Sequence, residues 1–121
     1  MMKALVIDDR REMADSLSKM LSLLNIDVDI AYGSRSAMQT LKISTPDVVF
    51  LDISMPGVDG FEVLGYLRRV PGMEKTPVVV VTSDDQPETY RKAEQGGALA
   101  LIVKPATLEA IEAALSKAKI K

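Results

Sequence analysis

Five polar side chains each follow a short apolar run, and their types suit chemistry on a phosphoryl group. They comprise two adjacent acids, a third acid, a hydroxyl and a cation, namely Asp8, Asp9, Asp52, Thr82 and Lys104. A carboxylate can act as a nucleophile toward phosphorus, while a hydroxyl and an ammonium group stabilise phosphoryl oxygens. We therefore predict phosphoryl chemistry on a carboxylate, provided that the fold brings the five side chains together.

The apolar runs that precede these residues are predicted to be β-strands. Runs rich in Val, Ile and Leu alternate with longer stretches of helical periodicity, and the predicted strands are residues 4–7, 28–31, 48–51, 78–81 and 99–103. Because most of them lack a polar face, they are typical of a parallel sheet covered by helices on both sides. The predicted fold is an α/β three-layer sandwich, in which ligands collect at the carboxyl ends of the strands.

Helical periodicity predicts five helices around this sheet. The first ends near Asn25, and the second begins at an N-cap, either Ser34 or Ser36. Gly96 and Gly97 are typical of a helix end and stop the fourth. The remaining helical ranges are residues 61–69, residues 87–95 and a last helix that follows Thr107 and runs to Lys121.

Length and hydrophobicity restrict the class of protein. With 121 residues, the chain has room for one domain, so we expect a single domain over residues 1–121. No apolar run approaches the roughly 20 residues that a membrane span requires, and no signal peptide precedes the first strand. We therefore expect a cytoplasmic protein that does not interact with a membrane.

The chain contains no cysteine and no histidine. Thiol nucleophiles, Ser-His-Asp catalysis and most zinc sites are excluded, so a bound metal has to be a hard cation held by oxygen. Phosphate that comes from phosphohistidine has to come from a partner protein. A net charge of −2 and a pI near 5.1 argue against direct binding of nucleic acid.

The three acids share one pocket if the strand order is 2-1-3-4-5, because the first and third strands are then neighbours. Like charges this close imply a bound divalent cation or strongly shifted pKa values, and Mg²⁺ fits carboxylate oxygens best. Each acid also has a plainer interpretation. Asp8 and Asp9 could cap the following helix, and Asp52 could be a turn residue. Thr82 could be an ordinary β-branched strand residue, whereas Lys104 has to point into the crevice.

Taken together, these residues resemble the response regulator receiver domain over essentially the whole chain. The same resemblance includes the segments Met55-Pro56, Gly57-Val58-Asp59-Gly60, Thr82-Ser83, Gly97-Ala98 and Lys104-Pro105. It implies a flavodoxin-like (CheY-like) doubly wound sandwich, with a five-stranded parallel sheet of order 2-1-3-4-5 and five helices. It also implies a signalling switch rather than an enzyme, one that assists its own aspartyl phosphorylation and dephosphorylation.

The resemblance implies a role for each candidate residue. Asp52 is the implied phosphoacceptor, and Thr82 and Lys104 are implied to contact the phosphoryl group. Asp9 and Asp52 are implied to ligate Mg²⁺ with the backbone carbonyl of Ser54. The other acid of the pair, Asp8, is implied to contribute through waters of the metal.

At the implied switch the chain departs from the family. Receivers usually carry Tyr or Phe three residues before the lysine, and Leu101 has neither ring nor hydroxyl. With Thr82 and Leu101 as switch residues, we expect a smaller change than is typical on the face of the fourth helix, fifth strand and fifth helix. Ser54 and Asp84 occupy positions that flank the attacking water in this family, so we expect them to tune the lifetime of the phosphorylated state.

The implied partners are a sensor histidine kinase or a histidine phosphotransfer protein, and a downstream effector or a missing output domain. A phosphorylation-dependent dimer is also compatible with the family.

Three other classes of function compete with a phosphorylated switch. A scaffold receiver would not need the intact set of reactive groups, and a magnesium-dependent phosphohydrolase would carry a second acid where this chain has Ser54. A flavodoxin-like nucleotide binder would need hydroxyls and glycines where Asp8, Asp9 and Arg10 stand.

Overall fold

The computed structural model describes residues 2–57 and 59–118. Its strands are β1 (Lys3–Ile7), β2 (Asp27–Ala31), β3 (Val48–Asp52), β4 (Val78–Thr82) and β5 (Ala100–Val103). They form one parallel sheet in the order β2-β1-β3-β4-β5. The predicted topology is confirmed, and the bounds of each strand lie within one residue of the predicted range.

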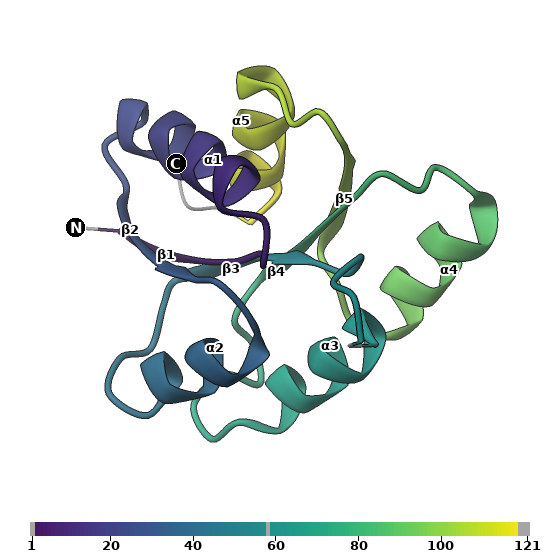
Figure 1. Cartoon of the computed structure of the whole chain (residues 1–121), viewed down its shortest axis with the longest axis horizontal. Coiled ribbons are helices and arrows are strands. Elements are labelled where there is room, and N and C mark those ends of the chain that lie inside the picture. The colour runs from purple at the N-terminus through teal and green to yellow at the C-terminus, as the bar shows by residue number, and fades with distance from the viewer. Residues whose placement is uncertain (1, 58, 119–121) are drawn as a thin grey trace.

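The helices of the described residues are α1 (Arg11–Leu23), α2 (Ser34–Leu41), α3 (Gly60–Arg69), α4 (Pro87–Gln95) and α5 (Leu108–Lys117). Figure 1 shows α1 and α5 on one face of the sheet and α2, α3 and α4 on the other. The chain is therefore the predicted three-layer sandwich. Because every crossover passes through a helix, all five strands point the same way and end at one edge.

Most helix ends follow the predicted signals, and one does not. Asn25 follows α1 with φ 63°, and Gly97 follows α4 with φ 89°, conformations that these residue types tolerate better than others. The prediction of a serine N-cap for α2 was wrong, because Gly33 is the N-cap and Ser34 and Ser36 already lie within the helix. Gly33 has φ 153°, which side chains disfavour, so the chain turns into the helix before it reaches the serines.

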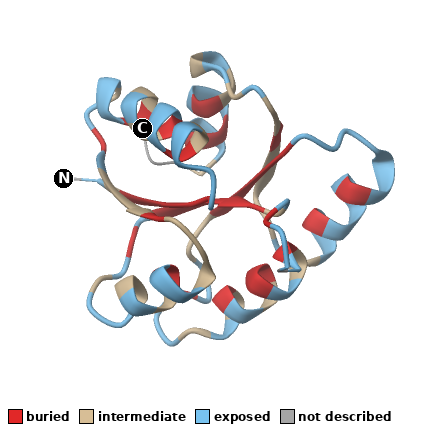
Figure 2. Ribbon diagram, in the orientation of Figure 1, coloured by how far each residue is buried: buried red, intermediate tan, exposed pale blue. Residues whose placement is uncertain are grey.

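Alternate strand residues face two separate cores. Phe50 packs with α1 and α5, whereas its neighbours Val49 and Leu51 pack with α2, α3 and α4. All residues of β3 and β4 are buried, and Figure 2 shows the centre of the sheet in red. Burial of one such large apolar side chain contributes about 2 kcal/mol. The two cores hold the central strands, and hence the polar residues at their ends, in a fixed frame.

Two parts of the predictions fall outside the described residues. The first is Val58, in the segment after the third strand. The second is the end of the predicted last helix, residues 119–121. Among the residues that the structure describes, no helix has the length and apolar character needed to cross a bilayer.

Candidate functional site

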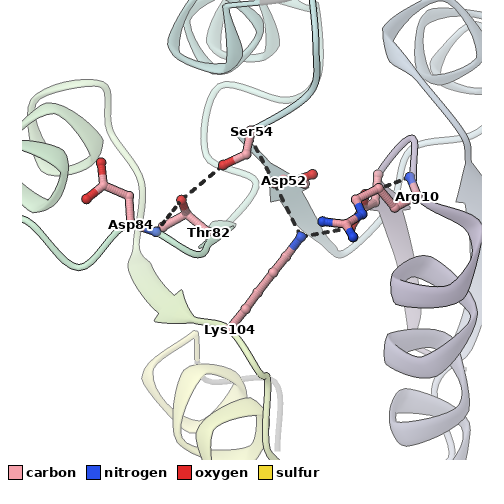
Figure 3. A network of polar contacts seen from close by, with 7 residues as sticks. Arg10, Asp52, Ser54, Thr82, Asp84 and Lys104 are labelled. Carbon is pink, nitrogen blue, oxygen red and sulfur yellow. Dashed lines mark hydrogen bonds and ion pairs between the residues drawn. The ribbon is translucent and has the colours of Figure 1, made fainter.

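The carboxyl ends of four strands bring the candidate residues to one crevice. Asp8 directly follows β1, Asp52 is the last residue of β3, Thr82 is the last of β4, and Lys104 directly follows β5. Strand register supports this, because Asp52 is paired with Val81, the residue before Thr82. Figure 3 shows the side chain of Lys104 reaching across this edge toward Asp52.

The three acids form one cluster at this edge. One carboxylate oxygen from each of Asp8, Asp9 and Asp52 lies within 4.8 Å of the others. Asp8 and Asp52 are 4% and 2% exposed, whereas Asp9 is exposed. The predicted clustering is confirmed. The plainer interpretation of the acid pair as helix caps does not hold for α1, since Arg10 is its N-cap and no side chain caps it.

Burial raises the pKa of Asp52 above its ordinary value, and the nearby carboxylate of Asp8 raises it further. Two groups act in the opposite direction, namely the backbone N–H of Ser54 and the ammonium of Lys104. Because burial is the largest cause and outweighs them, this carboxylate is poorly stabilised as an anion. A cation added to the cluster would relieve that cost.

Lys104 supplies the positive charge within the cluster. Its Nζ lies 3.4 Å from Asp8 Oδ2 and 3.6 Å from Asp52 Oδ1, and its side chain is only 8% exposed. Because a buried ammonium is costly unless it is paired, the two acids and the lysine stabilise one another. The Lys104-Pro105 peptide bond is cis. The expectation that this lysine points into the crevice is confirmed.

The two oxygens of Asp52 have different surroundings. Oδ1 accepts a hydrogen bond of 2.9 Å from the backbone N–H of Ser54 and faces Lys104. Oδ2 is buried and has no hydrogen-bond partner. An unpaired buried carboxylate oxygen costs free energy unless something else binds it. Oδ2 is therefore available as a nucleophile or a metal ligand.

The Thr82 hydroxyl is linked to the cluster through Ser54 rather than through the acids. Thr82 is fully buried, and its Oγ1 lies 3.3 Å from Ser54 Oγ. The same Oγ1 accepts a hydrogen bond of 3.1 Å from the backbone N–H of Asp84. Figure 3 shows this chain of contacts running from Asp84 through Thr82 to Ser54. Thr82 thus joins the site, while the role of the Ser54 carbonyl as a ligand stays a prediction.

Thr89, on the first turns of α4, was missed from the sequence. It is 7% exposed, and its Oγ1 donates a hydrogen bond of 2.6 Å to Asp84 Oδ2. This bond, together with one from the backbone N–H of Gln86, holds the pKa of Asp84 below its ordinary value. The sequence held one indication of this role. Thr89 stands two residues after Pro87, and it is the polar member of the two buried residues of α4, Thr89 and Ala93.

Leu101 lies on β5 opposite Val80 and packs, half-buried, against the core shared with α4. Two hollows of about 400 and 440 Å³ border it, and both are lined by Tyr90 of α4 and Lys117 of α5. The predicted switch position is therefore on the expected face. Both hollows adjoin Leu101, and a larger ring at this position could fill part of them.

Comparison with known proteins agrees with this geometry. The family model described as response regulator receiver domain matches residues 4–116. The chain is 35% identical over 106 residues to the sensory/regulatory protein RpfC of Xanthomonas campestris pv. campestris, covering 86% of this chain and 15% of that protein. It is 34% identical over 107 residues to the response regulator MprA of Mycolicibacterium vanbaalenii, covering 88% of this chain and 46% of that protein. The chain thus spans less than half the length of these relatives.

Among solved structures, the chemotaxis protein CheY4 of Vibrio cholerae superposes with a TM-score of 0.91 at 27% identity, covering 98% of both chains. The signal receiver domain of a DNA-binding response regulator from Colwellia psychrerythraea gives a TM-score of 0.90 at 27% identity, covering all of both chains. Both likenesses extend over the full sheet and all helices. The strand ends that form the acidic crevice are therefore within the shared fold.

Proposed function

We propose, from the premise that the chain belongs to the response regulator receiver domain family, that it is a signalling switch whose phosphoacceptor is Asp52. The observation that carries this proposal is Asp52 Oδ2, a buried oxygen without a hydrogen-bond partner, beside the Lys104 ammonium. A nucleophile needs a free electron pair, and a phosphoryl group needs nearby positive charge. Both requirements meet at this one side chain.

In the proposed transfer, Asp52 Oδ2 forms the new bond to phosphorus while the bond from phosphorus to a donor nitrogen breaks. The leaving imidazole keeps the electron pair and takes up a proton. The proposed donor is a phosphohistidine, and it lies outside residues 1–121, which contain no histidine. Lys104 and the Thr82 hydroxyl stabilise the phosphoryl oxygens, so Thr82 exchanges its contact with Ser54 for one with the phosphoryl group.

The acidic cluster fits Mg²⁺ as its cofactor. Three carboxylates whose oxygens lie within 4.8 Å of one another form a hard-oxygen donor set, and one of these residues carries an orphaned buried oxygen. We assign Asp8, Asp9 and Asp52, with the backbone carbonyl of Ser54, as the residues that hold the ion. Bound Mg²⁺ would neutralise negative charge on the phosphoryl oxygens. The chain itself supplies the nucleophile, the ammonium and the hydroxyl.

The output of the switch follows from the position of Thr82. A new charge at Asp52 draws the Thr82 hydroxyl inward, and the effect reaches α4 through Asp84 and the face around Leu101. We propose a sensor histidine kinase or histidine phosphotransfer protein as donor, and an effector protein or output domain as reader. The proposal also includes a phosphorylation-dependent dimer and a cytoplasmic location. It further includes one receiver domain over residues 1–121 that makes no direct contact with nucleic acid.

Intact mass after incubation with acetyl phosphate tests the proposal. Wild-type protein should gain one phosphoryl group only when Mg²⁺ is present, and Asp52→Asn should gain none. Asp27→Asn is a matched control, since Asp27 is exposed on β2 and should leave the gain intact. If folded wild-type protein gained no mass with Mg²⁺ from acetyl phosphate or from a phosphorylated histidine kinase, a scaffold role would replace phosphorylation.

A further inference from the structure

Asp84 touches the proposed site with its backbone and turns its carboxylate away. Its N–H donates to Thr82 Oγ1 at 3.1 Å, so the residue stands directly beside the phosphoacceptor pocket. Figure 3 shows the carboxylate pointing to the side opposite Thr82 and Lys104. A negatively charged residue therefore contacts Thr82 through its backbone, while its carboxylate points away from the proposed site.

Both oxygens of this carboxylate are held by the start of α4. Oδ1 accepts from the backbone N–H of Gln86 at 2.9 Å, and Oδ2 accepts from Thr89 Oγ1 at 2.6 Å. Thr89 is 7% exposed, so its hydroxyl has little water as an alternative partner. Short hydrogen bonds to an ionised carboxylate are among the stronger ones in proteins. Asp84 itself is exposed, so water would solvate the freed oxygen, and the carboxylate could leave α4, if that hydroxyl were removed.

We propose that Thr89 is a positioning residue, which lengthens the life of the aspartyl phosphate by holding the Asp84 carboxylate against α4 and away from Asp52. This inference rests on the proposed function and adds a regulator of the same site. Once the bond from Thr89 is lost, only the solvent-exposed bond from the Gln86 N–H holds the carboxylate. Each time that single bond opens, rotation about the Cα–Cβ bond of Asp84 moves the carboxylate among staggered positions. The backbone of Asp84 stays beside Thr82 throughout.

A released carboxylate promotes hydrolysis of the aspartyl phosphate. Water forms a bond to phosphorus as the bond from phosphorus to the Asp52 oxygen breaks, and the electron pair of that bond returns to the Asp52 carboxylate. The phosphate leaves with the remaining O–H of the water. The proton that the water gives up passes to the Asp84 carboxylate and then to solvent, which is general-base assistance. With Thr89 in place, Asp84 is occupied and solvent alone takes that proton.

Two substitutions at position 89 separate the hydroxyl from the packing. Thr89→Val keeps the branched shape and removes the donor, whereas Thr89→Ser keeps the donor and removes a methyl group. We expect Thr89→Val to shorten the half-life of the aspartyl phosphate by a factor of about three to ten, the range for one lost hydrogen bond. Thr89→Ser should stay close to wild type. Thr40→Val is the matched control, because it removes a hydroxyl bonded within α2, to the Ser36 carbonyl.

A second readout does not require phosphorylation. Carboxyl resonances of Asp84, followed by NMR against pH, should give a higher pKa in Thr89→Val than in wild type, because the Thr89 hydrogen bond is the largest cause that lowers it. Thr89→Ser should keep the lower pKa. If the pKa of Asp84 rises in Thr89→Val and not in Thr89→Ser, the Thr89 hydroxyl holds the Asp84 carboxylate in the unphosphorylated protein. An unchanged pKa in Thr89→Val would contradict the inference.

The double variant Asp84→Ala/Thr89→Val decides whether Thr89 acts through Asp84. We expect its half-life to return at least to that of wild type, because no carboxylate is left to release. An equally short half-life in the double variant would overturn the inference, since the effect would then come from α4 itself. Unchanged half-lives in Thr89→Val would also overturn it. If wild-type protein takes up no phosphoryl group at all, the proposed function fails first, and the inference fails with it.

Discussion

Lys104 Nζ lies 3.6 Å from Asp52 Oδ1, with 8% of the lysine side chain and 1% of the aspartate side chain exposed. The same ammonium lies 3.4 Å from Asp8 Oδ2. In the unphosphorylated protein the lysine therefore offsets the negative charge of Asp8 and Asp52. The same lysine is proposed to stabilise the phosphoryl oxygens during transfer to Asp52. One cation would then serve both the stability of the resting protein and the proposed phosphoryl transfer to Asp52.

Removal of this cation should destabilise the protein. Lys104→Met leaves two buried carboxylates without their partner, and we expect a loss of about 2–4 kcal/mol in the free energy of unfolding. Added Mg²⁺ should restore part of that loss, because it supplies positive charge to the same acids. Urea unfolding with and without Mg²⁺ measures both effects. Lys75→Met, at an exposed position, should change little, and equal stability of the two variants would contradict the pairing.

Removal of the Asp52 carboxylate, the proposed phosphoacceptor, should have the opposite effect on stability. The pKa of Asp52 is raised on folding, chiefly by burial, so the folded state binds its proton more tightly than the unfolded state does. The resulting stability is present below the ordinary aspartate pKa and is lost as pH rises through the higher folded value. We expect Asp52→Asn to lack this loss and to be more stable than wild type at neutral pH without Mg²⁺. Thermal unfolding across this pH range checks the sign, and parallel pH profiles would disprove it.

Ser54 should affect the lifetime of the phosphorylated state. Its Oγ lies 3.3 Å from Thr82 Oγ1 and would compete with a phosphoryl group on Asp52 for that hydroxyl. We expect Ser54→Ala to free Thr82 and lengthen the half-life of the aspartyl phosphate by about threefold, as loss of one competing hydrogen bond allows. Loss of radiolabel over time gives the half-life. Ser36→Ala on the exposed side of α2 is the control, and a shortened half-life in Ser54→Ala would exclude competition.

Leu101 should limit the signal that reaches the face of α4, β5 and α5. The leucine is half-buried and offers no hydroxyl to follow Thr82, so beryllofluoride, a phosphate mimic, should shift amide resonances on this face only modestly. Leu101→Tyr should enlarge those shifts, since a ring can occupy the hollows beside β5. Two-dimensional NMR compares the two proteins. Large wild-type shifts centred on Leu101 would refute the prediction.

Gly60, the first residue of α3, should be needed for the loop that follows Asp52. A Cβ placed there would lie 2.3 Å from Ile53 Cα, which is backbone and cannot move aside cheaply. We expect Gly60→Ala to cost about 1–3 kcal/mol of stability. Gly65→Ala, in the same helix with only an Arg69 nitrogen at 3.7 Å, should stabilise by about 0.5–1 kcal/mol. Chemical unfolding of both variants tests the contrast, and similar losses would count against the steric explanation.

The sequence by itself indicated an α/β sandwich with polar residues at a common edge of its sheet, while the resemblance to receivers implied the strand order and the role of each residue. Apolar runs such as residues 48–51 and 78–81 have no polar face, which only a sheet covered on both sides satisfies. Because parallel strands end at one edge, the acids, the hydroxyl and the lysine that follow these runs had to meet there. Local periodicity and chain connectivity indicate the strands and their common edge, because the order of residues fixes both directly.

Only the tertiary structure decided how the groups in the crevice pair with one another. Lys104 and Asp8 are 96 residues apart, and their contact depends on the packing of strands from both ends of the chain. Thr82 contacts Ser54 and Asp84, and Thr89 donates a hydrogen bond to Asp84. No local sequence pattern indicates that these side chains bond to one another rather than to water. A side chain adopts the conformation of lowest free energy, which depends on its possible hydrogen-bond partners, its burial and its rotamer preferences. Those partners exist only once the chain has folded.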